Sequence, residues 1–153
     1  MKLSILFEDN LDLHDKDEWG DIDDLIGDAI RRGERDPELE RFILDQHDSY
    51  HAYNYVIDVI EGRWIEGEEI IKKDPGYAYK YAINVIKGRW IEGEEEIKKN
   101  PGYAYYYAKN VIKGRWVEGE EGIKKNSYYA YLYARNVLKL NDEKAREWSR
   151  YGD

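Results

Sequence analysis

The chain has 153 residues and no cysteine, which excludes disulfide bonds and cysteine-ligated zinc sites. Its net charge of −9 lies at the front, because residues 1–49 hold 16 Asp/Glu and 6 Lys/Arg whereas residues 50–153 hold 17 and 18. No apolar run is long enough to span a membrane and no secretory signal is evident, so we expect a cytoplasmic protein.

Residues 1–49 predict an acidic segment followed by capping helices. The stretch KLSILFE, residues 2–8, fits a strand and a short helix equally well. A first amphipathic helix has Asp21 as its candidate N-cap and Gly33 as its candidate end. The apolar residues spaced to share one face of this helix are Ile22, Leu25, Ile26, Ala29 and Ile30.

A second helix is predicted directly after it. Asp36 is its candidate N-cap and Pro37 its first residue. Its apolar face contains Leu39, Phe42 and Ile43. The two helices together have the form of a degenerate repeat that caps the N-terminal end of residues 50–140.

A 26-residue repeat fills residues 50–140. The residues that recur at this period are Ala52, Ala78, Ala104 and Ala130; Tyr53, Tyr79, Tyr105 and Tyr131; Tyr55, Tyr81, Tyr107 and Tyr133; and Val59, Val85, Val111 and Val137. The tripeptide GRW occurs at 62–64, 88–90 and 114–116, and the fourth copy lacks it. The constant spacing predicts three and a half repeats over 50–140, with residues 141–153 as a C-terminal capping helix.

Each copy contains the start and stop signals of two helices. Asp74-Pro75 and Asn100-Pro101 are typical of an N-cap followed by proline at the first helical position, and Asn126 takes the same place without proline. The first helix is expected to run about twelve residues to Gly88 or Gly114. The second covers IEGEEEIKK, with glutamates in its first turn and lysines in its last, as the helix dipole favours. One such hairpin cannot bury its own apolar face, whereas stacked hairpins can. Glycine recurs inside the second helix at Gly67, Gly93 and Gly119, which suggests close backbone contact there.

The sequence therefore predicts an all-α fold, a short right-handed αα-hairpin solenoid with a divergent acidic N-terminal cap. The segment YAYKYAINVIKGRWIEGEEEIKK and its copies resemble arrays of short αα-hairpin repeats of unassigned function, seen in phage and large-virus proteins and in some bacterial effectors. The resemblance covers about 50–140. It implies this fold and a phage or viral source, in which case the cytoplasm is that of the host.

The tyrosines divide by their place on the first helix. At 100° per residue, Tyr107 shares the apolar face with Ala104 and Ala108, so Tyr107 and its equivalents are predicted core. Tyr105 and its equivalents fall at the boundary of that face. Tyr106 points away from it and is predicted to be exposed.

No cofactor, metal site or catalytic group is predicted. The stretch DKDEWGDIDDLI fits four positions of a calcium loop but places Trp19 at position 5 and Ile26 where a bidentate glutamate is required. We interpret it as a solvated acidic loop. His47 and His51 are four residues apart but lack an HExxH context, and His51 occupies the tyrosine slot of later repeats. The periodic glutamates are predicted to serve the helix dipole and solvation, so no enzyme is expected.

Three non-enzymatic functions compete. The first is a protein-binding module, because Tyr, Trp and Arg are enriched at binding hot spots; its candidate residues are Tyr79, Tyr105, Tyr106 and Tyr131. The second is an acidic inhibitor of a host nuclease or defence protein that mimics DNA, with the candidate residues Asp15, Asp17, Glu18, Asp21, Asp23 and Asp24. The third is a self-associating structural protein, such as a homodimer. Direct nucleic-acid binding is disfavoured, because ladders of lysine pairs and of Arg63, Arg89 and Arg115 are matched by a glutamate ladder.

Overall fold

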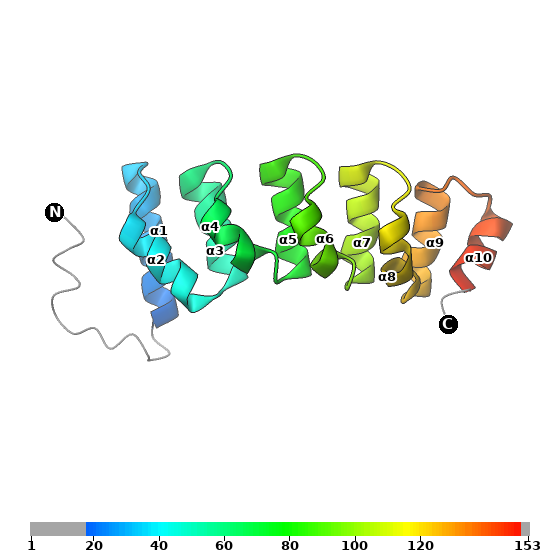
Figure 1. Cartoon of the computed structure of the whole chain (residues 1–153), viewed down its shortest axis with the longest axis horizontal. Helices are drawn as coiled ribbons and strands as arrows, with labels where there is room; N and C mark the ends of the chain where they lie inside the picture. Colours follow the sequence, from blue (N-terminus) through cyan, green and yellow to red (C-terminus); the bar gives the residue numbers. More distant parts are fainter. Residues whose placement is uncertain (1–17, 151–153) are drawn as a thin grey trace.

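The computed structural model describes residues 18–150, with side chains from residue 22 onward. This part of the chain is all-α and contains no strand, which confirms the all-α part of the prediction (Figure 1). The stretch KLSILFE lies outside the described residues. The α-helices are α1 (Glu18–Arg32), α2 (Pro37–Gln46), α3 (Ser49–Tyr55), α4 (Ile65–Ile71), α5 (Pro75–Tyr81), α6 (Ile91–Ile97), α7 (Pro101–Tyr107), α8 (Glu120–Lys124), α9 (Ser127–Asn136) and α10 (Asp142–Arg150).

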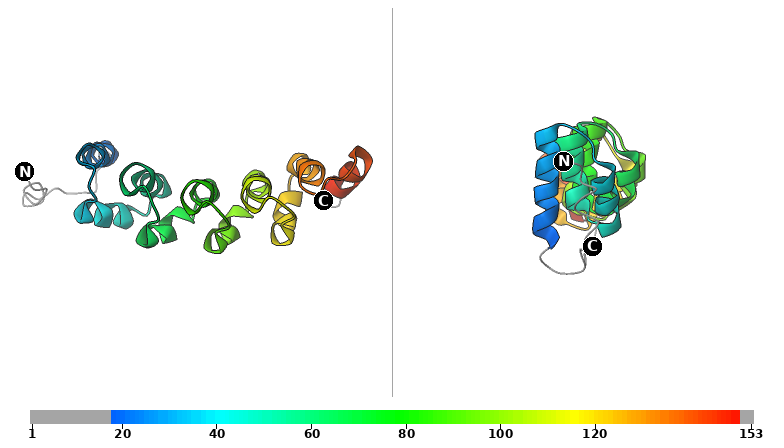
Figure 2. Two further views of the ribbon diagram at one scale, coloured as in Figure 1. Left: turned by 90° about the horizontal axis from the view of Figure 1, so that it is seen from above. Right: turned by 90° about the vertical axis from the view of Figure 1, so that its left-hand side faces the viewer.

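The helices lie side by side in an elongated, gently curved array. Seen from above, α1, α3, α5, α7 and α9 form one row on the inner side of the curve, and α2, α4, α6 and α8 form the other (Figure 2). The inner helices α3, α5 and α7 each contact the outer helix that follows in the sequence, the outer helix that precedes, and their inner neighbours. We call the two sets the inner row and the outer row.

Short polar side chains cap the helix starts, as predicted. The side chains of Asp36, Asp74, Asn100 and Asn126 each accept hydrogen bonds from two backbone N–H groups at the start of the following helix. The prediction for Asp21 is wrong, because α1 already begins at Glu18 and Asp21 falls inside it. The acidic stretch expected to be a loop is therefore helical from residue 18.

The inner helices end in a wide turn that the sequence did not reveal. Three of them continue into one turn of π-helix: η2 (Val56–Ile60) after α3, η3 (Ala82–Ile86) after α5 and η4 (Ala108–Ile112) after α7. The expected length of about twelve residues thus holds. The chain then reverses at Glu61, Lys87 and Lys113, which have φ of 52°, 56° and 59°. The helices thus end just before Gly88 and Gly114, as predicted, and the residue with the left-handed conformation is the lysine before each glycine.

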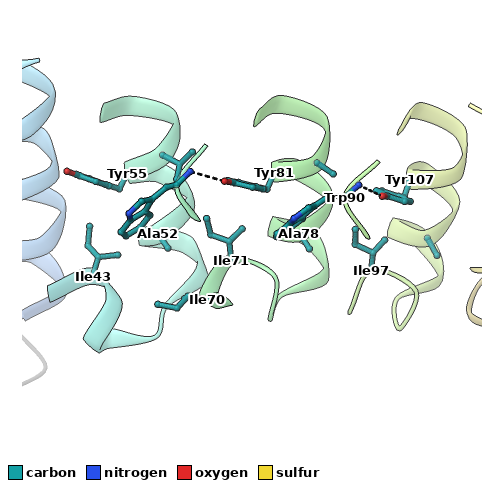
Figure 3. Packing of buried hydrophobic residues seen from close by; sticks show 14 of the residues in the cluster. Ile43, Ala52, Tyr55, Ile70, Ile71, Ala78, Tyr81, Trp90, Ile97 and Tyr107 are labelled. Carbon is teal, nitrogen blue, oxygen red and sulfur yellow. Dashed lines mark hydrogen bonds between the residues drawn. The ribbon is translucent and has the colours of Figure 1, made fainter. Parts of the chain in front are cut away.

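The core runs along the array between the two rows. Tyr55, Tyr81, Tyr107 and Tyr133 are fully buried, which confirms the prediction for this series, and they pack with the recurrent alanines and with Trp64, Trp90 and Trp116. Figure 3 shows the tyrosines pointing toward the preceding repeat. In α1, Ile22, Ile26 and Ala29 are buried. Ile30 was expected on the same face but is 44% exposed, because it lies at the edge of that face.

The recurrent glycines of the outer row make room for tryptophan rings. A Cβ atom on Gly93 would lie 2.5 Å from Cε3 of Trp90, and Gly67 and Gly119 have the same relation to Trp64 and Trp116. The expected tight contact is therefore present, but the indole ring and not a neighbouring backbone makes it. In the third repeat the outer helix starts with a 3-10 turn, η5 (Val117–Gly119), before α8.

Candidate binding surface

A repeated cluster of hydrogen-bonded polar groups joins each repeat to the next. We call each such cluster of an arginine, a glutamate, a backbone N–H and a tyrosine a rung. The Tyr107 hydroxyl donates to Glu94 Oε1 at 3.0 Å and accepts from the Trp90 backbone N–H at 2.8 Å. Arg89 holds the same carboxylate through Nε and Nη2, at 2.6 and 3.0 Å. Tyr81 makes the equivalent bonds to Glu68 and Trp64, and Tyr133 to Glu120 and Trp116. Every rung thus takes Arg, Trp and Glu from one repeat and Tyr from the next.

These rungs correct the role predicted for the glutamates. Glu68 and Glu94 are buried, with 7% of their surface exposed, and each is held by an arginine and a tyrosine. A buried carboxylate is tolerated only when it is paired and hydrogen-bonded. These glutamates are therefore structural joints between repeats, whereas their neighbours Glu66 and Glu92 are exposed, as expected of solvated residues.

The same rung occurs once more at the N-terminal cap. Tyr55 donates to Glu40 at 3.0 Å and accepts from the backbone N–H of Asp36, and Arg35 binds Glu40 through two nitrogens. The stretch RDPELE therefore corresponds to RWIEGE of the repeats. The shared spacing R-x-x-E-x-E was visible in the sequence and would have located the rung. In the cap, Asp36 replaces Trp and Leu39 replaces the glycine that the indole ring requires.

The surroundings of each rung raise the pKa of its tyrosine hydroxyl. Burial raises the pKa of Tyr55 and of Tyr133 to about 12. Burial likewise raises the pKa of Tyr81 and Tyr107 above its ordinary value. In each case a nearby glutamate adds to the shift and the backbone N–H opposes it. The hydroxyls therefore stay protonated and serve as donors.

A second ladder joins neighbouring helices of the inner row. The side-chain amides of Asn84, Asn110 and Asn136 donate to the hydroxyls of Tyr53, Tyr79 and Tyr105, at 2.8, 2.9 and 2.8 Å. Each bond connects residues 31 apart and so crosses from one repeat to the next. Tyr79 and Tyr105 are predicted site residues, and their hydroxyls therefore accept hydrogen bonds that hold neighbouring repeats together.

The rings of this ladder join further tyrosines into an aromatic surface. Tyr79 lies 6.0 Å from Tyr103, Tyr105 lies 6.1 Å from Tyr129, and Tyr106 lies 6.4 Å from Tyr79 and 6.3 Å from Tyr129, between ring centroids. We call this surface the tyrosine face; it consists of Tyr50, Tyr53, Tyr77, Tyr79, Tyr103, Tyr105, Tyr106, Tyr128 and Tyr129. All of its members lie on α3, α5, α7 and α9, the inner row.

The tyrosines predicted to bind a ligand differ in how much of their surface is exposed. Tyr106 is 40% exposed, as predicted, because it lies on the side of α7 opposite the buried Ala104. Tyr105 was expected at the boundary but is only 2% exposed, since Tyr106 and Tyr129 pack against it. Tyr79 is half-buried. Tyr131 is half-buried and donates its hydroxyl to Asp142 of α10, away from the ring contacts of the tyrosine face. Tyr128, not predicted, is the most exposed at 63%.

The predicted acidic residues are only partly covered by the structure. Asp15 and Asp17 lie outside the described residues, and Glu18 and Asp21 lie in the first turns of α1, where only the backbone is described. Asp23 and Asp24 are exposed on α1. Asp23 approaches the buried His51, whose ring also binds Asp48 at 2.6 Å. His51 thus packs between the cap and the first repeat.

The outer row carries a different surface. Arg63, Arg89 and Arg115, which the sequence offered as a phosphate ladder, are bound to the rung glutamates. The residues that follow the tryptophans are exposed aliphatics, Ile65 at 59%, Ile91 at 68% and Val117 at 61%. Among residues 18–150, no group of three His, Cys, Asp or Glu side chains could hold a metal ion.

Comparison with protein families, with curated proteins and with solved structures found no match to this chain. None of the helices between residues 18 and 150 has the length and apolar character needed to cross a lipid bilayer.

Proposed function

We propose that the chain is a short right-handed αα-hairpin solenoid that binds a protein partner without catalysing a reaction, and that the tyrosine face is its contact surface. The observation that carries the proposal is the continuity of this face. Six of its tyrosines, from α5, α7 and α9, form one connected cluster of rings. Tyrosine is enriched at the centres of protein interfaces, where its ring contributes contact area with little loss of rotamer freedom.

The internal structure of the face supports this proposal. The Asn–Tyr hydrogen bonds and the ring contacts hold the partly buried tyrosines in place before any partner binds. Tyr103 and Tyr129 are also seated on glycines of the preceding repeat, Gly76 and Gly102, where a Cβ atom would approach each ring to 2.9 Å. A preorganised surface loses less conformational entropy on binding than a mobile one.

A capture experiment with matched variants tests the proposal. The full chain is immobilised and exposed to bacterial lysate, following the phage origin that the repeat resemblance predicts. Tyr106→Ser with Tyr128→Ser removes two exposed rings from the tyrosine face, whereas Ile65→Ser with Ile91→Ser removes two exposed aliphatics from the outer row. We expect a partner that binds the parent and the outer-row variant and is lost from the tyrosine variant. Circular dichroism of each variant confirms helicity. Equal capture by both variants, or no specific partner, contradicts the proposal.

A further inference from the structure

Charge in the repeats is sorted between the two rows. The inner-row segments 75–87, 101–113 and 127–139 contain six basic residues and no Asp or Glu. These residues are Lys80, Lys87, Lys109, Lys113, Arg135 and Lys139. All six are exposed. The outer-row segments 62–73, 88–99 and 114–125 contain every glutamate that lies between residues 62 and 139. The near-neutral total for residues 50–153 therefore conceals an inner row that is basic in repeats two to four and an outer row that carries the glutamates.

Among the described residues, the five inner-row lysines are free of ion pairs, and Arg135 donates to the carbonyl of Leu140. Within residues 18–150, none of the six forms an ion pair. In the outer row, by contrast, the three arginines and Lys72, Lys98 and Lys99 all bind glutamates. Ion pairing within the chain therefore neutralises much of the outer row and leaves the inner row positive.

Two of these cations lie on the tyrosine face itself. Lys80 Nζ is 4.8 Å from the ring centroid of Tyr77, and Lys109 Nζ is 5.7 Å from that of Tyr105. Lys87 and Lys113 border a hollow of about 160 Å³ between η3 and η4, which Ile83 and Val111 also line. The tyrosine face thus combines aromatic rings with unpaired ammonium groups, and the recess adjoins it at Asn110, which lines the recess and donates to Tyr79.

We infer that the tyrosine face binds an acidic segment of a protein partner across repeats two to four. The inference rests on the proposed function and adds the chemistry of the partner. Carboxylates would pair with the free lysines, and apolar side chains between them would contact the rings. The acidic segment ends its contact before the first repeat, because Glu61 stands there in the position of Lys87, Lys113 and Lys139 and would repel it. Asp58, in the position of Asn84, adds a second negative charge.

A protein segment fits these observations better than a nucleic acid. Single-stranded nucleic acid binds by stacking bases on separate aromatic platforms along a strongly basic groove. Here the tyrosine rings pack against one another, and the arginines, whose forked geometry suits phosphate, are occupied by glutamates.

Fluorescence anisotropy with labelled probes tests the inference on the full chain. The probes are dodecaglutamate, an oligonucleotide of twelve thymidines and dodecalysine. The variant Lys80→Glu with Lys109→Glu reverses two charges on the tyrosine face. The control, Lys73→Glu with Lys125→Glu, makes the same change of net charge on exposed outer-row lysines that form no ion pair within residues 18–150.

We expect dodecaglutamate to bind the parent in 50 mM NaCl and to weaken as salt rises, because exposed charges are screened. The face variant should lose at least roughly tenfold in affinity and the control less than about twofold. Tighter binding of the oligonucleotide, equal losses in both variants, or no binding of dodecaglutamate would each overturn the inference. If capture from lysate depends on Tyr106 and Tyr128 while these charge tests fail, the proposed function stands and only the acidic partner is rejected.

Discussion

Replacing Gly93 by alanine tests the packing of tryptophan over glycine. In an exposed helix this change is stabilising by about 1 kcal/mol, because glycine has the poorer helix propensity. Here the new Cβ would lie 2.5 Å from Cε3 and 2.8 Å from Cζ3 of Trp90. The indole has little room to withdraw, since it is 2% exposed and its ring lies 4.9 Å from that of Tyr81. Overpacking of this kind costs about 1–3 kcal/mol.

The net expectation for Gly93→Ala is a loss of about 1–2 kcal/mol in the free energy of unfolding. Urea unfolding followed by circular dichroism measures it, and the midpoint should fall by about 0.5–1 M. Gly27→Ala in α1 is the matched control, because the nearest atom to its new Cβ is the flexible Arg31 Nη1 at 3.6 Å. It should stabilise the chain by up to about 1 kcal/mol.

A second background sharpens this test. In a Trp90→Leu chain the ring that blocks the new Cβ is gone, so Gly93→Ala should become stabilising even though Trp90→Leu itself weakens the core. If Gly93→Ala raises the midpoint of the parent chain, as Gly27→Ala does, the steric argument for the recurrent glycines is refuted.

Further predictions concern the rungs and the C-terminal cap. Tyr107→Phe should lower the free energy of unfolding by about 2–4 kcal/mol, because it orphans the buried Trp90 N–H and removes a donor from Glu94; a denaturation curve within about 1 kcal/mol of the parent would exclude this role. The pKa of Tyr133 is raised to about 12, so the folded chain holds this proton more tightly than the unfolded chain, where the pKa is about 10. The resulting stability is fully present below pH 10 and is lost as pH rises toward 12, so thermal midpoints should fall over that range; a flat profile would contradict the assignment. Trp148→Ala should cost about 1–3 kcal/mol, since its half-buried ring lies 5.3 Å from that of Tyr133, and an unchanged melting temperature would show that α10 is not needed as a cap.

The periodicity of the sequence predicted the burial of residues that share one face of a single helix. Tyr107 and Ala104 fall on the same side of their helix, and stacking of repeats buries that side, so their burial followed from spacing alone. The N-caps were equally accessible, because an Asp or Asn before proline acts within one turn. The free lysines of the inner row were also present in the sequence, but a count over the whole repeat averaged them with the glutamates.

Other features depend on contacts between repeats and escaped a residue-by-residue interpretation. Glu94 is identical in type to its solvated neighbours, and only the approach of Arg89 and Tyr107 makes it a buried joint. Lys87 has no intrinsic preference for a left-handed backbone, so its φ of 56° is imposed by the chain reversal at the end of its helix and not by its own propensity. The burial of Tyr105 depends on Tyr106, which no other repeat possesses.

The direction of the rungs has a consequence for synthesis. In every rung the glutamate precedes its tyrosine, by 15 residues at the cap and by 13 in the repeats. A chain that emerges from the ribosome N-terminus first can therefore close each rung once one further helix has appeared. The cap rung of Glu40 and Tyr55 closes first and gives the second repeat a finished surface on which to fold. The nascent chain never waits for a distant C-terminal partner, and at most one rung is incomplete while the array grows.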